Sequence, residues 1–176
     1  MNAIRQIFKS ATSAPKAARD VLTLVFAHEL IVPSKTLFLV TPWISNIVVF
    51  DNTLGEYEGL NPEWARRQVR LVDVLVALTS NGTHIVMRVR PDAHNKSFHT
   101  RLFSALKDIG LQDRCDWTNS EALHTKGLLT DHVLLSGSMN FTERGVAFND
   151  ESLTVSFDAQ QIAQAKLEFE SNHGVA

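Results

Sequence analysis

The sequence contains a single cysteine, and this scarcity limits how the chain can be stabilised. With only Cys115 present, no intrachain disulfide can form. Such cysteine usage is typical of cytoplasmic proteins, so we expect a cytoplasmic location. No His or Cys pair has the spacing of a known metal site, and we therefore expect neither a metal nor another cofactor.

The chain also lacks an excess of positive charge, internal repeats and linker-like tracts. It has 17 Lys and Arg against 19 Asp and Glu, for a formal net charge of -2. This balance excludes a protein whose whole surface is strongly basic for nucleic-acid binding, but it allows a local basic patch. Because no repeat or Gly/Ser tract divides the 176 residues, we expect a single domain over 1–176.

No apolar run is long enough to cross a membrane. The most hydrophobic stretch, 21–32, is interrupted by His28 and Glu29. An amphipathic helix that begins near Pro15, within an N-terminal helical segment 1–30, explains this stretch better. Its apolar residues recur at helical spacing: Val21, Leu22, Val25, Phe26 and Leu30.

Strand-like and helix-like segments alternate along the rest of the chain. The expected strands are 36–41, 83–90, 113–117, 122–130, 133–136 and 152–157. The expected helices run from an Asn61 cap until Asn81-Gly82 stops the first, over 98–109, and over 159–170. This alternation predicts an α/β fold with a mixed sheet and helices on both of its faces.

The most informative segment is 124–131, which reads HTKGLLTD. In a strand, His124 and Lys126 would point to the same face because side chains alternate. An imidazole can attack phosphorus or donate a proton, while an ammonium can bind phosphate oxygens. An H-x-K-x-x-x-x-D match alone is weak evidence, since it arises by chance in roughly one such chain in a hundred.

A second group of polar residues follows directly and argues against coincidence. Ser138 and Asn140 provide short polar donors, and we expect Gly137 to let the backbone approach a ligand closely. Asn149 and Glu151 then open the next expected strand. The combination predicts a phosphate-binding site rather than an isolated motif match.

Together, HTKGLLTD, GSMNFTERG and NDE resemble the HKD motif region of the phospholipase D superfamily over 124–151. The strand–helix layout from 36 to 157 is compatible with the phospholipase D-like fold, and no motif covers the first 30 residues. The resemblance implies a phosphodiesterase that needs no metal. One histidine attacks phosphorus to form a phosphohistidine, and a second protonates the leaving oxygen and then activates water.

The resemblance also implies roles for individual residues. His124 would be the nucleophile or the acid/base, and Glu151 would orient a histidine. The phosphate would be held by Lys126, Ser138 and Asn140. Asp131 completes the motif at a turn, where we expect a structural role.

Larger members of the superfamily carry two HKD motifs, whereas this chain has one and no repeat. A site that needs two histidines must then draw on two chains. The resemblance to small single-motif nucleases implies a homodimer with a shared active site at its two-fold axis.

The stretch 88–101 gathers cationic side chains after an expected strand, where loops of α/β sheets often line a site. Its candidate substrate-binding residues are Arg88, Arg90, Lys96 and Arg101. A groove for a phosphate backbone and a merely solvated loop both fit this composition. Trp43, at the end of an expected strand, fits either a stacking platform or an ordinary core or rim aromatic.

These features favour a nuclease that cleaves nucleic-acid phosphodiesters. The chain also looks similar to phospholipase D-like proteins of bacterial gene clusters that place 7-deazapurines in DNA. That likeness implies DNA modification or phage defence, with partner proteins from such a system. Two alternatives stay open: a phospholipase or phosphatidyl transferase, and a non-catalytic nucleic-acid-binding subunit of a larger complex.

Overall fold

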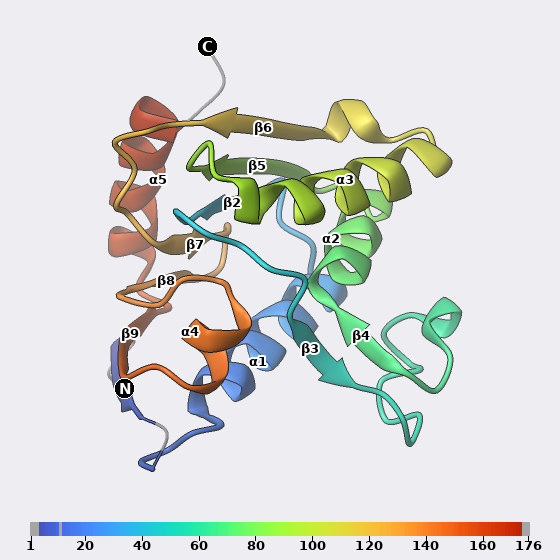
Figure 1. Ribbon diagram of the computed structural model, residues 1–176, viewed down its shortest axis with the longest axis horizontal. Helices are drawn as coiled ribbons and strands as arrows, with labels where there is room; N and C mark the ends of the chain where they lie inside the picture. Colours follow the sequence, from blue (N-terminus) through green and yellow to red (C-terminus); the bar gives the residue numbers. More distant parts are fainter. Residues whose placement is uncertain (1–3, 11, 174–176) are drawn as a thin grey trace.

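The protein is built around one mixed β-sheet with helices on both faces, as the computed structural model shows (Figure 1). The structure describes residues 4–10 and 12–173, so 1–3, 11 and 174–176 of the expected domain lie outside the described residues. The sheet has seven strands in the order β1-β9-β8-β7-β2-β5-β6. Their bounds are β1 Ile4–Lys9, β2 Thr36–Val40, β5 His84–Val89, β6 Cys115–Asn119, β7 Gly127–Leu129, β8 Leu134–Gly137 and β9 Glu151–Ser156.

Strands β2, β5 and β6 run parallel, and the remaining neighbours in the sheet are antiparallel. A second, two-stranded sheet joins β3 (Val48–Asp51) to β4 (Gln68–Arg70). The helices are α1 Ala17–Ile31, α2 Leu71–Ser80, α3 Ala93–Asp108, α4 Glu143–Ala147 and α5 Ala159–His173, with 3-10 turns at Pro62–Trp64 and Gln112–Arg114. The predicted α/β architecture is thereby confirmed.

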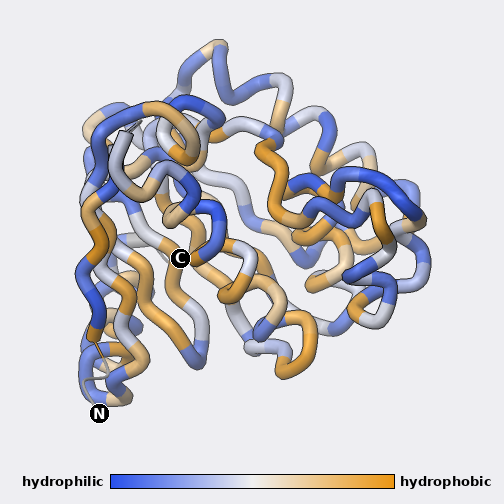
Figure 2. Tube along the Cα trace, turned by 90° about the horizontal axis from the view of Figure 1, so that it is seen from below, coloured by the Kyte–Doolittle hydropathy of each residue, from blue (hydrophilic) through white to orange (hydrophobic). Residues whose placement is uncertain are grey.

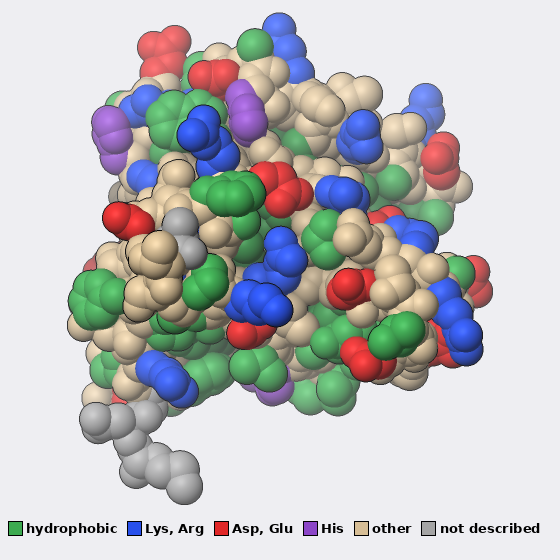
Figure 3. Space-filling model, turned by 60° about the horizontal axis from the view of Figure 1, so that its bottom comes forward, with side chains coloured by type: hydrophobic (Ala, Val, Ile, Leu, Met, Phe, Trp, Pro, Cys, Tyr) green, Lys and Arg blue, Asp and Glu red, His purple; other side chains and the backbone are tan. Residues whose placement is uncertain are grey.

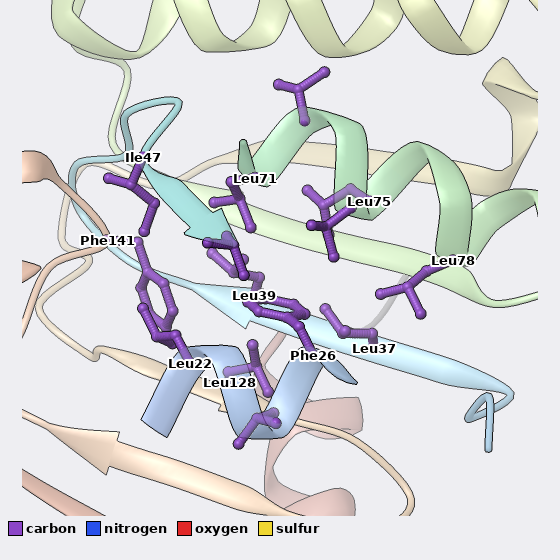
Figure 4. Packing of buried hydrophobic residues seen from close by; sticks show 14 of the residues in the cluster. Leu22, Phe26, Leu37, Leu39, Ile47, Leu71, Leu75, Leu78, Leu128 and Phe141 are labelled. Atoms are coloured by element: carbon purple, nitrogen blue, oxygen red, sulfur yellow. The ribbon is translucent and has the colours of Figure 1, made fainter. Parts of the chain in front are cut away.

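Strand β2, in the interior of the sheet, separates two hydrophobic cores. Leu37 and Leu39 face the larger core, where they pack with side chains of α1 and α2 (Figure 4). Phe38 and Val40 face a smaller core that is closed by α5. Figure 2 shows hydrophobic and hydrophilic stretches alternating along the chain, with hydrophilic stretches prominent in the outer turns of the trace. This two-sided burial explains why β2 reads as a continuous apolar run.

The helix expected from Asn61 to Asn81-Gly82 is confirmed in its second half, which is α2 with Asn81 as its C-cap, but is wrong for residues 61–70. Asn61 does cap a turn by accepting a hydrogen bond from Glu63 N at 2.9 Å, but only a 3-10 turn follows. Trp64 is then buried with its ring centroid 5.3 Å from that of Phe50, and Ala65 adopts a φ of 52°. The left-handed backbone ends the turn, and α2 starts only at Leu71.

The N-terminal segment also differs from the expected helix. Residues 4–9 form β1, which pairs antiparallel with β9 at the edge of the sheet, and only 17–31 are helical.

Helix α3 also differs from the expectation: it begins at Ala93 instead of 98, because the Asp92 side chain accepts a hydrogen bond from His94 N at 2.8 Å. Within the described residues, no helix combines the length and hydrophobicity that a membrane span requires.

Gly137 allows two strands to approach closely, which is a different role from the ligand contact that its sequence context suggested. Its φ is 152°, and a Cβ atom there would lie 2.0 Å from the Ser152 carbonyl oxygen of β9. No side chain fits at that distance.

We therefore expect Gly137→Ala to lower the free energy of unfolding by about 3 kcal/mol or more, measured by urea denaturation. Gly110→Ala is the matched control, because Gly110 has a φ of 71° but a Cβ atom there would have no neighbour within 4 Å. Gly110→Ala therefore measures only the loss in free energy of unfolding that comes from the positive φ, which is about 1–2 kcal/mol. Equal losses in the two variants would contradict the steric explanation.

Candidate active site

Strand direction brings the candidate residues to one edge of the sheet. The carboxyl ends of the parallel strands β2 and β5 meet there, and β7 and β9 begin at the same edge because they run in the opposite direction. Arg90 follows β5, and Ser138 follows β8. His124 and Lys126 precede β7, while Glu151 opens β9. Residues from distant parts of the sequence thus converge at this edge.

His124 and Lys126 lie in the loop before β7, not in the longer strand expected over 122–130. His124 is exposed, and Lys126 Nζ donates a hydrogen bond to the His124 carbonyl at 2.8 Å. Arg90 Nη2 lies 3.0 Å from His124 Nε2, and Arg90 Nε donates to the Leu123 carbonyl at 2.8 Å. Arg90 Nη2 also lies 3.4 Å from His124 Nδ1, so the guanidinium, which only donates, faces both ring nitrogens.

Arg90 is itself held by an aromatic side chain at the end of β2. Its guanidinium carbon lies 5.4 Å from the Trp43 ring centroid, within range of a cation–π contact. Trp43 Nε1 donates to Asp92 Oδ2 at 3.1 Å. Hydrogen bonds from the His94 N–H and the Trp43 indole hold the pKa of Asp92 below its ordinary value. The contacts that link Asp92 to Trp43, Trp43 to Arg90 and Arg90 to His124 therefore hold the His124 imidazole in position.

Ser138 and Glu151 form a second polar group at this edge. The Ser138 hydroxyl donates a short hydrogen bond to Glu151 Oε2 and accepts one from Ser152 N at 3.0 Å. Asn149 Nδ2 donates to Glu151 Oε1 at 3.4 Å. Lys9, buried on β1, donates to the Asn149 carbonyl at 2.7 Å. Within the described part of one chain, Glu151 therefore hydrogen-bonds Ser138 and Asn149 and no histidine.

Asn140 is fixed by the buried end of β2. Its Oδ1 lies 3.3 Å from Thr41 Oγ1, whose single proton it shares with the Trp43 carbonyl at 3.0 Å, and Thr41 is fully buried. The backbone around Asn140 is tightly wound, because a Cβ atom on Gly145 would lie 2.3 Å from the Asn140 carbonyl oxygen. Among the described residues, the Asn140 NH2 group has no hydrogen-bond partner, so it is available to donate to an anion.

Asp131 lies at the opposite end of β7 from His124. Its carboxylate accepts hydrogen bonds from Lys35 N and from Lys166 Nζ, each at 2.8 Å. Partial burial raises the pKa of Asp131, but the hydrogen bonds from Lys166 and Lys35 outweigh it and hold the pKa below its ordinary value. The residue joins the turn after β7 to α5 and to the start of β2.

The four cationic residues of the stretch 88–101 do not form one surface. Arg88 lies on β5 two residues after Val86, on the face covered by α5, and its Nε is buried without a hydrogen-bond partner among the described residues. Arg90 and Lys96 line one hollow, whereas Arg101 lines another, together with Arg70. Figure 3 shows cationic and anionic side chains interspersed on the face it draws.

Sequence reasoning missed three supporting residues: Thr41, Lys9 and Asp92. Thr41 and Asp92 follow apolar strand-like runs, and the rule that sites form at strand ends could have identified them. Lys9 could not be identified from the sequence, because β1 itself was not expected.

Burial raises the pKa of the Cys115 thiol to about 12, so the cysteine stays protonated at neutral pH.

Comparison with known proteins adds a family match. The family described as "Cardiolipin synthase, PLD-like domain" matches residues 61–172, well over half of the chain. A curated relative, the mitochondrial cardiolipin hydrolase of Chlamydomonas reinhardtii, is 30% identical over 100 residues. That alignment covers 56% of this chain and 43% of the algal protein, so the chain spans less than half of its relative.

Solved structures share the fold over almost the whole chain. Nuc from Salmonella typhimurium, described as a phospholipase D family member, superposes with a TM-score of 0.60 at 12% identity, covering 97% of this chain and 92% of Nuc. NucT from Helicobacter pylori gives a TM-score of 0.58 at 12% identity, covering 96% of this chain and 94% of NucT. At such identities the likeness concerns the fold alone.

We predict that Asp131→Asn lowers stability without reducing any catalytic activity by more than about twofold. The ion pair with Lys166 is lost, which costs about 1 kcal/mol at neutral pH. Because the folded-state pKa of Asp131 is depressed, its contribution is present above the unfolded pKa and disappears as pH falls through the folded pKa. Urea denaturation at neutral and acid pH should show the variant and the wild type converging in acid, and a difference that persists there would contradict this account.

Proposed function

The chain belongs to the phospholipase D superfamily, in the family of the cardiolipin synthase PLD-like domain, and from this premise we propose that it is a phosphodiesterase that cleaves nucleic acid. The observation that carries the proposal is the exposed His124 imidazole, which lies beside the Arg90 guanidinium and in the same loop as the Lys126 ammonium. A guanidinium at the imidazole and an ammonium at the backbone carbonyl of the same residue suit the binding of an anionic phosphodiester beside a histidine nucleophile.

In the proposed reaction, a His124 ring nitrogen attacks phosphorus and the bond to the leaving oxygen breaks. The partner's His124 donates a proton to that oxygen. It then removes a proton from water, whose oxygen attacks phosphorus, breaks the phosphorus–nitrogen bond and regenerates His124. Lys126 and the Asn140 NH2 group would hold the non-bridging oxygens, and Ser138 would pair with Glu151 to shape the wall beside them.

Nucleic acid is our preferred substrate because the edge combines cations with aromatic rings. Arg90 lies over Trp43, and Lys96 lines the hollow that Arg90 also borders. Such combinations bind phosphates and stack bases. Action together with partner proteins in the cytoplasm, in DNA modification or phage defence, is part of the same proposal.

A lipid phosphodiesterase is the second candidate, and exposed aromatic side chains favour it. Phe8 is 67% exposed and pairs with Ser152, next to Glu151. Phe148 is 65% exposed and precedes Asn149. Both lie near the site edge, where an acyl chain could contact them. Hydrolysis of cardiolipin vesicles but not of oligonucleotides by the purified protein would favour this candidate, and cleavage of neither would favour a non-catalytic subunit.

We expect hydrolysis of labelled single-stranded DNA or RNA to persist in EDTA, because a histidine nucleophile needs no Lewis acid. His124→Ala should reduce the rate by about a thousandfold or more. His132→Ala is the matched control, since His132 lies in the turn at the far end of β7 and should retain activity. Activity that disappears in EDTA and returns with a divalent ion would overturn the metal-free mechanism.

We also expect a shared site in a two-fold homodimer, because the mechanism needs two histidines and the chain has one HKD motif. Wild type and His124→Ala are mixed under conditions of full subunit exchange. If one site needs both copies of His124, an equal mixture keeps about a quarter of full activity, the random share of wild-type pairs. About half of the activity, or an active monomer in sedimentation, would contradict the shared site and leave the phosphodiesterase proposal intact.

A further inference from the structure

A hollow of about 360 Å³ lies between the first half of α3 and the end of β6, and Arg90 connects it to His124. Arg90 belongs to both places, because it lines the hollow and its Nη2 lies 3.0 Å from His124 Nε2. A group bound in the hollow would therefore lie close to a phosphorus at His124. None of the HKD-motif residues lines it.

The inner wall of the hollow is aromatic. The half-buried rings of Trp117 and His99 have centroids 4.8 Å apart and meet at 77°, so they form a corner. A planar ring that stacks on one of these faces would meet the edge of the other, which is a favourable arrangement. Trp117 packs in turn on Phe98, with centroids 6.3 Å apart, so its position is fixed from behind.

The rim of the hollow is polar. Asn119 Oδ1 accepts a hydrogen bond from Trp117 Nε1 at 3.3 Å, and its NH2 group has no partner among the described residues. Lys96 is exposed at the rim. An amide donor beside an aromatic corner suits the edge of a nucleobase, and a cation suits the next phosphate. An acyl chain would leave these polar groups without partners.

We propose that this hollow binds one unstacked nucleobase of a nucleic-acid strand whose phosphate lies at His124. The inference rests on the proposed function and favours single strands as its substrate, because a base in a duplex must first be unpaired and unstacked before it can enter. Phe103 already stacks on one face of His99, with ring centroids 4.5 Å apart, so the base stacks on a face that Trp117 or His99 leaves uncovered. Asn119 contacts the base edge, and Lys96 binds the backbone.

The test measures binding, so that it does not depend on cleavage. Fluorescence anisotropy compares a labelled thymidine 12-mer with a 12-unit abasic chain of the same charge, in EDTA and in a His124→Ala background. We expect the thymidine strand to bind about tenfold tighter than the abasic chain, and about tenfold tighter than the same sequence in a duplex.

Three further variants separate stacking from charge. Trp117→Leu should remove the tenfold preference while leaving abasic binding unchanged, which also shows that the variant is folded. Lys96→Ala should weaken both ligands equally, because it removes a phosphate contact. Thr118→Ala, on the opposite face of β6, is the control and should change neither.

Equal binding of the thymidine and abasic strands to the parent protein, or equal weakening of both by Trp117→Leu, would overturn the base-binding hollow. Failure of the proposed function has a different signature. If strands bind with the expected base preference but wild type never hydrolyses them, the hollow stands and the nuclease activity is refuted.

Discussion

The two-sided burial of β2 is the constraint on which the rest of the structure depends. Leu37, Leu39 and Val40 are fully buried, and Phe38 is 4% exposed, so neither face of the strand can shift. Each such side chain contributes about 1.5–3 kcal/mol through burial. Thr41 follows directly and is therefore fixed in place, where its hydroxyl holds Asn140. The hydrophobic cores thus determine the position of a polar group at the site edge.

Local patterns in the sequence predicted those elements whose burial follows a simple period. β2 and β5 were recognisable as apolar runs, and α5 as an amphipathic segment, because each buries one face or both against the sheet. The first half of the helix expected after Asn61 failed because propensity contains no information on the positive φ of Ala65. β1 was missed because its pairing with β9 depends on a strand far away in the sequence.

The site residues divide in the same way, into those marked by a local sequence pattern and those positioned by distant parts of the chain. His124 and Lys126 could be found because the motif is local, and so could Ser138 and Asn140. The contacts that position them are not local: Arg90 and His124 are 34 residues apart, Thr41 and Asn140 are 99 apart, and Lys9 and Asn149 are 140 apart. These contacts follow from the strand order, which no periodicity in the sequence specifies.

Net charge is a poor guide to what such an edge can bind. The chain carries a net charge of -2, yet charges act mainly within a Debye length of about 8 Å at physiological salt. At the edge, Arg90 and Lys126 lie next to His124, whereas the Glu151 carboxylate is directed at Ser138 and Asn149. Asp92 accepts a hydrogen bond from Trp43 and also lies close enough to Arg90 to interact with its charge. Hydrogen bonds from neutral donors leave both carboxylates charged, so a phosphate at this edge is attracted only where Arg90 and Lys126 lie closer to it than Glu151 and Asp92 do.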